Sequence, residues 1–228
     1  MTSTPDDGPR QFFHWVEGLV HAGDPRLTSL GAAGGAIRAG VDDLARSVRR
    51  SLWHMTALPS WGEVGAARPL AEVADSPRVE YRYVTTPRAT GRLPMLTSHH
   101  RGVRLAPVVA PLLIVDASLV FVGVPRGNPL TGGVWSSTIP HVVAAAVRCF
   151  EHVWQGSEPA VPPGEDPPFT RRMVDIAFLL TDGASDRQIA RQLHVSERTV
   201  SADVSEVIRR LGARNRSHAI ALIGSGTY

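Results

Sequence analysis

The residues best suited to specific chemistry lie on one face of a helix expected between positions 196 and 211. The outward side chains of this helix are Arg198, Ser201, Ala202, Ser205, Glu206 and Arg209. Small side chains let a helix sit deep in the major groove of DNA, and arginines can reach phosphate oxygens. The pattern therefore indicates contact with double-stranded DNA.

Four short helices are expected to position this face, over residues 170–182, 185–193, 196–211 and 217–223. Ser185 and Gln188 form a capping box at the start of the second helix, and Ser196 can cap the third. A tight turn at residues 194–195 joins these two helices, which is helix-turn-helix geometry. The free amides at both helix starts can also bind phosphate.

The segment from Phe169 to Arg216 resembles the LuxR-type DNA-binding domain from end to end. The resemblance is carried by Phe169-Thr-Arg-Arg-Met, Asp182-Gly-Ala-Ser-Asp-Arg-Gln-Ile-Ala, Leu193-His-Val-Ser-Glu-Arg-Thr-Val and Leu211-Gly-Ala-Arg-Asn-Arg. It implies that the third helix reads DNA, that the second braces it, and that the last helix often dimerises. The expected DNA-binding residues are Arg187, Ser196, Arg198, Thr199, Ser201, Ala202, Ser205, Arg209 and Arg214.

The chain departs from the LuxR pattern at Met173, where the family usually has Glu, and at Ser201, where Lys is common. The third helix also carries Glu197, Asp203 and Glu206 against Arg198, Arg209 and Arg210. It is therefore formally neutral. Fewer cationic contacts are expected to weaken non-specific DNA binding and to flatten its salt dependence.

The composition excludes several kinds of chemistry. All 24 basic residues are arginine, as is typical of a GC-rich, for example actinobacterial, genome. The lack of lysine excludes Schiff-base catalysis and a Walker A phosphate loop. Residues 169–228 hold nine arginines and six acids, whereas residues 1–168 hold fifteen of each. The net charge of +3 thus lies in the C-terminal part, which is compatible with nucleic-acid contact.

The predicted organisation is an α/β N-terminal domain followed by an all-α, four-helix LuxR-type domain. A flexible or helical segment spans residues 1–28, and an α/β sensor or dimerisation domain spans 29–155. A Pro-rich linker follows at 156–168, and the helix-turn-helix domain occupies 169–228.

Within the N-terminal part, apolar periodicity predicts helices at 11–20, 29–52, 67–74 and 140–154. Strands are predicted at 51–58, 79–85, 103–106 and 112–124, the last one split by a turn at 116–118.

The stretch from Ala110 to Gly123 resembles the strand-turn-strand of the phospholipase D superfamily. The region from about Leu30 to Trp154 resembles degenerate phospholipase-D-like domains of actinobacterial regulators. Val109 and Pro111 occupy the positions of the catalytic His and Lys, so no catalytic residues and no enzyme activity are expected. Asp116 is interpreted as a turn residue rather than a ligand. The domain either binds an effector in the old catalytic cleft or serves dimerisation and partner contacts.

No cofactor or metal site is predicted. His99 and His100 are adjacent and are expected on a solvated loop without a third ligand. Cys149 lies on an apolar helix face and is expected to be buried and inert. The polar N-terminus is unlike a signal peptide, and prolines and Asp116 break the most apolar stretch, so we expect a cytoplasmic protein with no membrane partner.

Together these patterns predict a sequence-specific transcription regulator that binds a pseudo-palindromic operator as a homodimer, with an effector as a further partner of the N-terminal domain. The alternative is an interaction protein that dimerises with or titrates another regulator, because its neutral recognition helix does not bind DNA.

Overall fold

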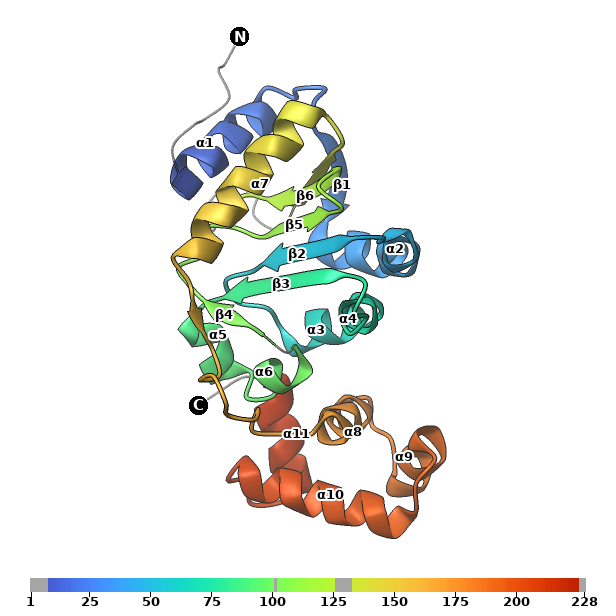
Figure 1. The fold of residues 1–228 in the computed structure, drawn as a ribbon. Coiled ribbons are helices and arrows are strands. Elements are labelled where there is room, and N and C mark those ends of the chain that lie inside the picture. Colours follow the sequence, from blue (N-terminus) through green and yellow to red (C-terminus); the bar gives the residue numbers. More distant parts are fainter. Residues whose placement is uncertain (1–7, 101, 126–132, 226–228) are drawn as a thin grey trace.

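The computed structural model describes residues 8–100, 102–125 and 133–225, with the backbone alone described for residues 32–39 and 225. An α/β domain forms one end of the molecule, and four C-terminal helices form the other (Figure 1). The predicted N-terminal segment is helical over α1 (Gly8–His21), and residues 1–7 lie outside the described residues. No helix among the described residues is long and apolar enough to cross a membrane.

One mixed sheet organises the α/β domain, with the strand order β1-β7-β6-β5-β2-β3-β4-β8. Its strands are β1 (Thr28–Ala32), β2 (Ser51–Met55), β3 (Glu80–Thr85), β4 (Arg104–Leu105), β5 (Leu112–Val115), β6 (Leu119–Gly123), β7 (Gly133–Ser137) and β8 (Glu158–Pro159). Strand β3 runs parallel to both β2 and β4, and the remaining pairs are antiparallel.

Helices cover both faces of this sheet (Figure 1). Helix α1 and the long helix α7 (Pro140–Gln155) lie side by side on one face. The other face carries α2 (Ala33–Ser47), α3 (Trp61–Ala66) and α4 (Arg68–Ala74). The short helices α5 (Pro87–Arg92) and α6 (Leu96–His99) lie at the end nearest the C-terminal helices.

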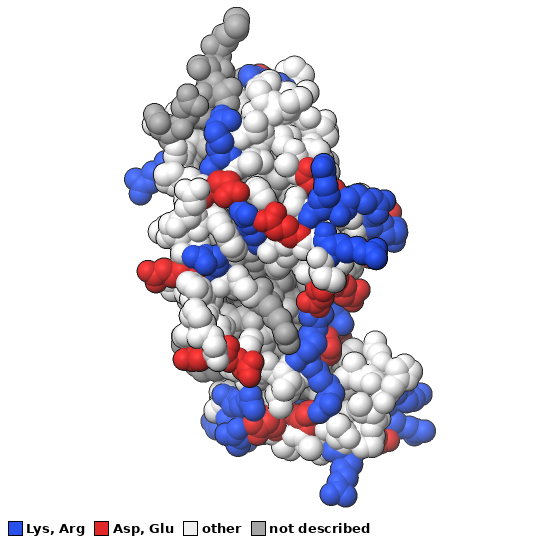
Figure 2. Space-filling view, viewed as in Figure 1, with Lys and Arg blue, Asp and Glu red and all other residues white. Residues whose placement is uncertain are grey.

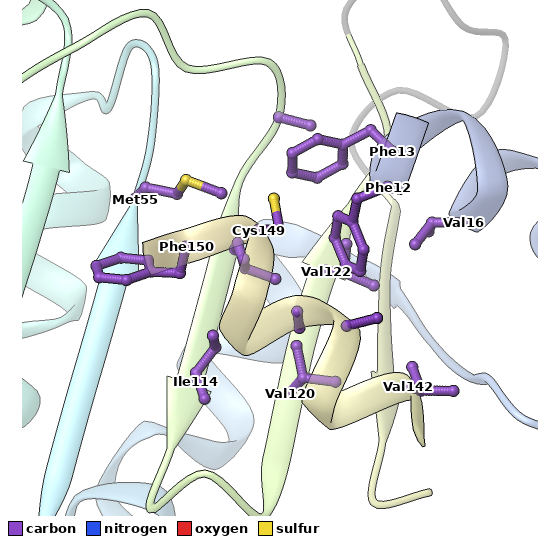
Figure 3. Packing of buried hydrophobic residues seen from close by; sticks show 14 of the residues in the cluster. Phe12, Phe13, Val16, Met55, Ile114, Val120, Val122, Val142, Cys149 and Phe150 are labelled. Carbon is purple, nitrogen blue, oxygen red and sulfur yellow. The ribbon is translucent and has the colours of Figure 1, made fainter. Parts of the chain in front are cut away.

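The period of two in the strands explains how one sheet supports two cores. In β5, Ile114 faces α1 and α7, whereas Val115 packs with residues of the opposite face. Figure 3 shows the first of these cores, where Phe12 and Phe13 of α1 and Phe150 of α7 meet the sheet. The predicted burial of Cys149 is confirmed, and burial raises the pKa of its thiol to about 12.

Most predicted elements are confirmed, but the helix predicted over 29–52 is wrong at its start. Residues 28–32 form the edge strand β1, which pairs with β7, and the helix begins only at Ala33. Local periodicity cannot register this partner, because β7 follows about one hundred residues later. Gly31, with φ +79°, lies between Ser29 and Ala32, where the register of the pairing with β7 shifts.

Asp116 is a turn residue. It stands between β5 and β6 with φ +52°, in the left-handed region that Asp tolerates. Its carboxylate accepts hydrogen bonds from the backbone amides of Arg49, Arg50 and Ser51, at 2.7–3.0 Å for the shortest contact of each. These bonds lower its pKa against the opposing effect of burial. The carboxylate thus ties the start of β2 to the β5–β6 turn.

The four C-terminal helices form as the sequence predicts: α8 (Arg171–Thr181), α9 (Asp186–Leu193), α10 (Glu197–Arg210) and α11 (Arg216–Ser225). Thr170, Ser185 and Ser196 cap the first three, and Ser185 with Gln188 completes the expected capping box. The preceding Pro-rich segment also contributes β8, whose pairing with β4 brings its first residues into the sheet.

The expectation that His99 and His100 are solvated is wrong. Their side chains are buried, because α6 packs its C-terminal end between β3 and α8. Nδ1 of His100 lies 2.9 Å from the Tyr81 hydroxyl, whereas neither ring nitrogen of His99 has a hydrogen-bond partner among the described residues. Burial, with Arg171 and Arg68 nearby, lowers the pKa of His99 from 6.5 to about 4.

This burial predicts sensitivity to acid. Because the folded pKa of His99 lies below the unfolded value of 6.5, the unfolded chain binds the proton first, and stability falls between about pH 6.5 and 4. A pKa shift of this size corresponds to a loss of about 3 kcal/mol of unfolding free energy once the pH has fallen below the folded pKa. Replacing His99 with Phe, which cannot ionise, should reduce the loss of unfolding free energy between pH 7 and 4.5. Urea unfolding at both pH values measures this loss of unfolding free energy, and the His152→Gln variant, changed at an exposed histidine, is the control. An unchanged loss in His99→Phe would contradict this account.

Candidate nucleic-acid interface

The helix pair α9 and α10 is held by a small apolar core of its own. Ile189 of α9 and Val200 and Val204 of α10 pack with Ile176 and Leu180 of α8. The turn between α9 and α10 is made by His194, whose φ of +53° reverses the chain, and the Val195 amide donates to the Ala190 carbonyl at 3.0 Å.

The start of α10 leaves backbone donors available. The Ser196 hydroxyl accepts a hydrogen bond from the Thr199 amide at 3.1 Å and lies 2.8 Å from the Thr199 hydroxyl. The amides of Glu197 and Arg198 lie in the first turn, where a helix supplies no acceptor. With the positive end of the helix dipole, they provide a place for a phosphate oxygen.

The outward face of α10 carries the side chains that the sequence predicts. Arg198, Ala202, Ser205 and Arg209 follow helical spacing along one exposed side, and Ser201 is exposed beside them. The Ser205 hydroxyl donates to the Ser201 carbonyl at 2.8 Å, so it lies close to the helix surface. The face therefore has small side chains in the middle and an arginine at each end, a shape that admits the edges of bases.

The remaining predicted residues lie at the start of α10, on α9 and in the loop after α10. Ser196 is exposed, whereas Thr199 is half-buried. Arg187 is exposed on α9, and Arg214 is exposed in the loop after α10, at the opposite end of that helix from Ser196. Figure 2 shows basic side chains projecting from this end of the molecule.

Asp203, which was counted from the sequence among the charges of this helix, lies on its inward side and adds no charge to the outward face. Its carboxylate is buried and accepts two hydrogen bonds from the Arg172 guanidinium of α8, at 2.5 Å from Nε and 3.2 Å from Nη2. Asp203 follows Val200 by three positions and therefore shares its inward side. Of the three acids counted on the recognition helix, only Glu197 and Glu206 remain near the outward side.

Glu206 neutralises part of the remaining positive charge. Hydrogen bonds from Arg209 first and Arg210 second lower the pKa of its carboxyl to about 2. Arg209 is thus paired with Glu206 when no DNA is bound. Arg198, by contrast, has no carboxylate within ion-pair distance among the described residues.

One exposed cation, Arg191, was not among the predicted residues. It lies one helical turn after Arg187 on α9, and that spacing of four was its only signal in the sequence. A contact within the domain was also not predicted from the sequence. Arg216, at the start of α11, pairs with Asp186 and donates a hydrogen bond to the Ala184 carbonyl at 2.7 Å. This contact joins the start of α11 to the start of α9.

The stretch from Ala110 to Gly123 in the N-terminal domain is held by close packing at both of its ends. Pro111 lies against Gly123, where a Cβ would approach the proline ring to 3.2 Å. Asp116 is occupied by backbone amides, as described above. No group of three or more potential metal ligands is found among the described residues.

Comparison with known proteins identifies the C-terminal helices. Residues 167–223 match the family of bacterial regulatory proteins, luxR family. This segment is a LuxR-type helix-turn-helix domain. Its α10 is the third helix of the domain, as the resemblance in the sequence implied.

Curated relatives match part of this chain. The response regulator RamR of Streptomyces coelicolor is 33% identical over 91 residues, which are 40% of this chain and 44% of that protein. The glycerol metabolism activator of Pseudomonas putida is 40% identical over 55 residues, 24% of this chain and 25% of that protein. The chain thus spans less than half the length of these relatives.

The N-terminal domain is similar in structure to Nuc, a phospholipase D family member from Salmonella typhimurium. The TM-score is 0.44 at 14% identity, over 58% of this chain and 96% of that chain. A likeness at this level does not carry the activity of that family to this chain.

The inward position of Asp203 predicts different effects for two acids of α10. Asp203→Asn should lower the free energy of unfolding by about 1–2 kcal/mol, because it weakens the bond to Arg172, and should leave DNA affinity within about twofold. Glu197→Gln, at the exposed helix start, should tighten DNA binding because it removes a charge near phosphate. Urea unfolding and fluorescence anisotropy with labelled DNA measure the two effects. Tighter binding by Asp203→Asn would show that Asp203 faces DNA.

Proposed function

We propose that this protein is a sequence-specific DNA-binding transcription regulator that reads its operator with α10. The observation that carries the proposal is the outward face of that helix, where Arg198 stands beside the small residues Ser201, Ala202 and Ser205 on a LuxR-type domain. The curated relatives are named as a response regulator and an activator, which supports the same class of function.

We further propose that two copies bind a pseudo-palindromic operator. A single recognition helix contacts only a few base pairs, and two helices related by a two-fold axis double the contact. The half-sites would lie about one helical turn of DNA, roughly 34 Å, apart. The N-terminal domain would pair the chains or bind an effector, and it would do so without catalysis, because Val109 and Pro111 replace the His and Lys of phospholipase D chemistry.

One observation favours a second candidate function. Glu206 occupies both Arg209 and Arg210, and Glu197 is exposed at the start of α10, so Arg198 is the one cation of this helix that carries no ion pair in the described structure. A recognition helix with so little available charge suits a protein that binds another regulator rather than DNA. The DNA-binding proposal remains the better supported, because Asp203 lies on the inward side of α10 and Arg187, Arg191 and Arg214 are further exposed cations of the same domain.

A DNA titration separates the two candidates. The full chain is titrated onto DNA from upstream of its own coding sequence at two salt concentrations, beside an Arg198→Ala, Arg209→Ala double variant. Binding should weaken as salt rises, and the double variant should bind about tenfold or more weakly, with a shallower salt dependence. Arg88→Ala, an exposed arginine on α5, is the control and should bind as the wild type does.

Equal binding by the wild type and the double variant would contradict recognition through α10. Absence of specific binding by a folded wild-type dimer would favour the interaction protein.

A further inference from the structure

The LuxR-type domain and the α/β domain share one apolar core, which we call the seam. Its members on the α/β side come from α3, β3, α5 and α6, and those on the other side come from α8, α10 and α11. Met173, at a position where the LuxR family usually has Glu, is buried in the seam together with Phe169 and Leu222. The departure from the family pattern thus falls within the core that both domains share.

Phe178 of α8 lies at the centre of the seam. The Trp61 indole of α3 stacks on its ring at 4.2 Å between centroids and 14° between planes. The Arg68 guanidinium lies 5.0 Å from the same centroid, and His99 approaches the ring edge-on at 5.1 Å. Three residues of the α/β domain therefore surround one side chain of the DNA-binding domain.

Directional polar contacts surround this aromatic cluster. Nε1 of Trp61 donates to the Thr181 hydroxyl of α8 at 3.2 Å, and Arg68 pairs with Asp175 of the same helix at 3.5 Å. Arg171 pairs with Asp75, just after α4, at 2.9 Å. These contacts hold α8 along its length. The seam therefore specifies one orientation of the LuxR-type domain relative to the α/β domain, as well as an area of contact.

Helix α8 also belongs to the core of the LuxR-type domain. Phe178 and Val174 face the seam, whereas Ile176, Leu179 and Leu180 pack beneath α9 and α10. Because its side chains are packed on both sides, α8 cannot leave the seam without exposing apolar surface, and it cannot unfold without disturbing both cores.

We propose that the seam joins the two domains into one cooperative unit, so that DNA bound at α10 stabilises the N-terminal domain. By reciprocity, an effector or partner whose affinity depends on this coupling would change DNA affinity through the same contacts. Trp61 and Arg68 are then positioning residues for DNA recognition, although they lie on the domain that does not contact DNA. The DNA-dependent part of this proposal rests on the proposed function, and the cooperative folding does not.

The distribution of tryptophan provides the measurement. All five tryptophans, Trp15, Trp53, Trp61, Trp135 and Trp154, precede the LuxR-type domain. Tryptophan fluorescence therefore reports the unfolding of the N-terminal domain, and far-UV circular dichroism reports the helices of both domains. Thermal unfolding of the full chain is followed with both signals, with and without operator DNA.

The test variant is the double substitution Trp61→Ala, Arg68→Ala, which removes two contacts to Phe178 and leaves every residue of the LuxR-type domain unchanged. The matched control is Arg82→Ala, Trp154→Ala. This second pair also stacks, with the guanidinium 5.2 Å from the ring, but it lies on the side of the sheet that packs with α7. Single Arg68→Ala is a milder variant should the double variant fold poorly.

In the wild type and in the control, the two signals should coincide, and saturating DNA should raise the tryptophan midpoint by about 5 °C. In the Trp61, Arg68 variant the signals should separate, and DNA should leave the tryptophan midpoint within about 1 °C of its value without DNA.

Separate transitions in the wild type, or coincident transitions and an equal DNA shift in the Trp61, Arg68 variant, would overturn the proposal. If DNA shifts nothing in any protein, the proposed function fails. The coincidence of the two signals in the wild type, and their separation in the variant, then still decides whether the seam makes one cooperative unit.

Discussion

The double burial of α8 is the constraint on which the rest of the structure depends. One side of this helix closes the core beneath α9 and α10, and the other packs Phe178 against Trp61 and Arg68 of the α/β domain. A helix packed on two sides cannot shift to suit one of them alone. The position of the recognition helix α10 is therefore set by contacts that reach into the N-terminal domain, in addition to the loop that precedes α8.

This arrangement leaves the outward face of α10 exposed. In Figure 1, α10 lies at the end of the molecule away from the sheet, and its exposed residues Arg198 and Ser205 belong to the side that is not packed on α8. Two ion pairs set the charge of this face. The Asp203 carboxylate points inward to Arg172, and the Glu206 carboxylate pairs with Arg209. The side packed on the α/β domain and the proposed DNA-reading side are thus different sides of the same small domain, which makes the proposed coupling compatible with access to DNA.

The features that could be predicted from the sequence are those that depend on residues close together in the chain. The capping residues Thr170, Ser185 and Ser196 identified the starts of three helices, because their hydroxyls satisfy amides within the same turn. Features that depend on distant partners were missed. Strand β1 requires β7, and the burial of His99 requires α8, some seventy or more residues away. The charge count of the third helix included Asp203 without regard to the side of the helix on which it lies, which its spacing from Val200 and Val204 would have supplied.

Hydrogen exchange on the full chain, with and without operator DNA, tests the central claim that α10 reads DNA. The account predicts slower exchange at the amides that open α9 and α10, near Ser185 and Ser196, and along α10 as far as Ser205, because phosphate and base contacts exclude water there. Protection confined to the α/β domain, with exchange in α10 unchanged while DNA is bound, would contradict recognition by this helix.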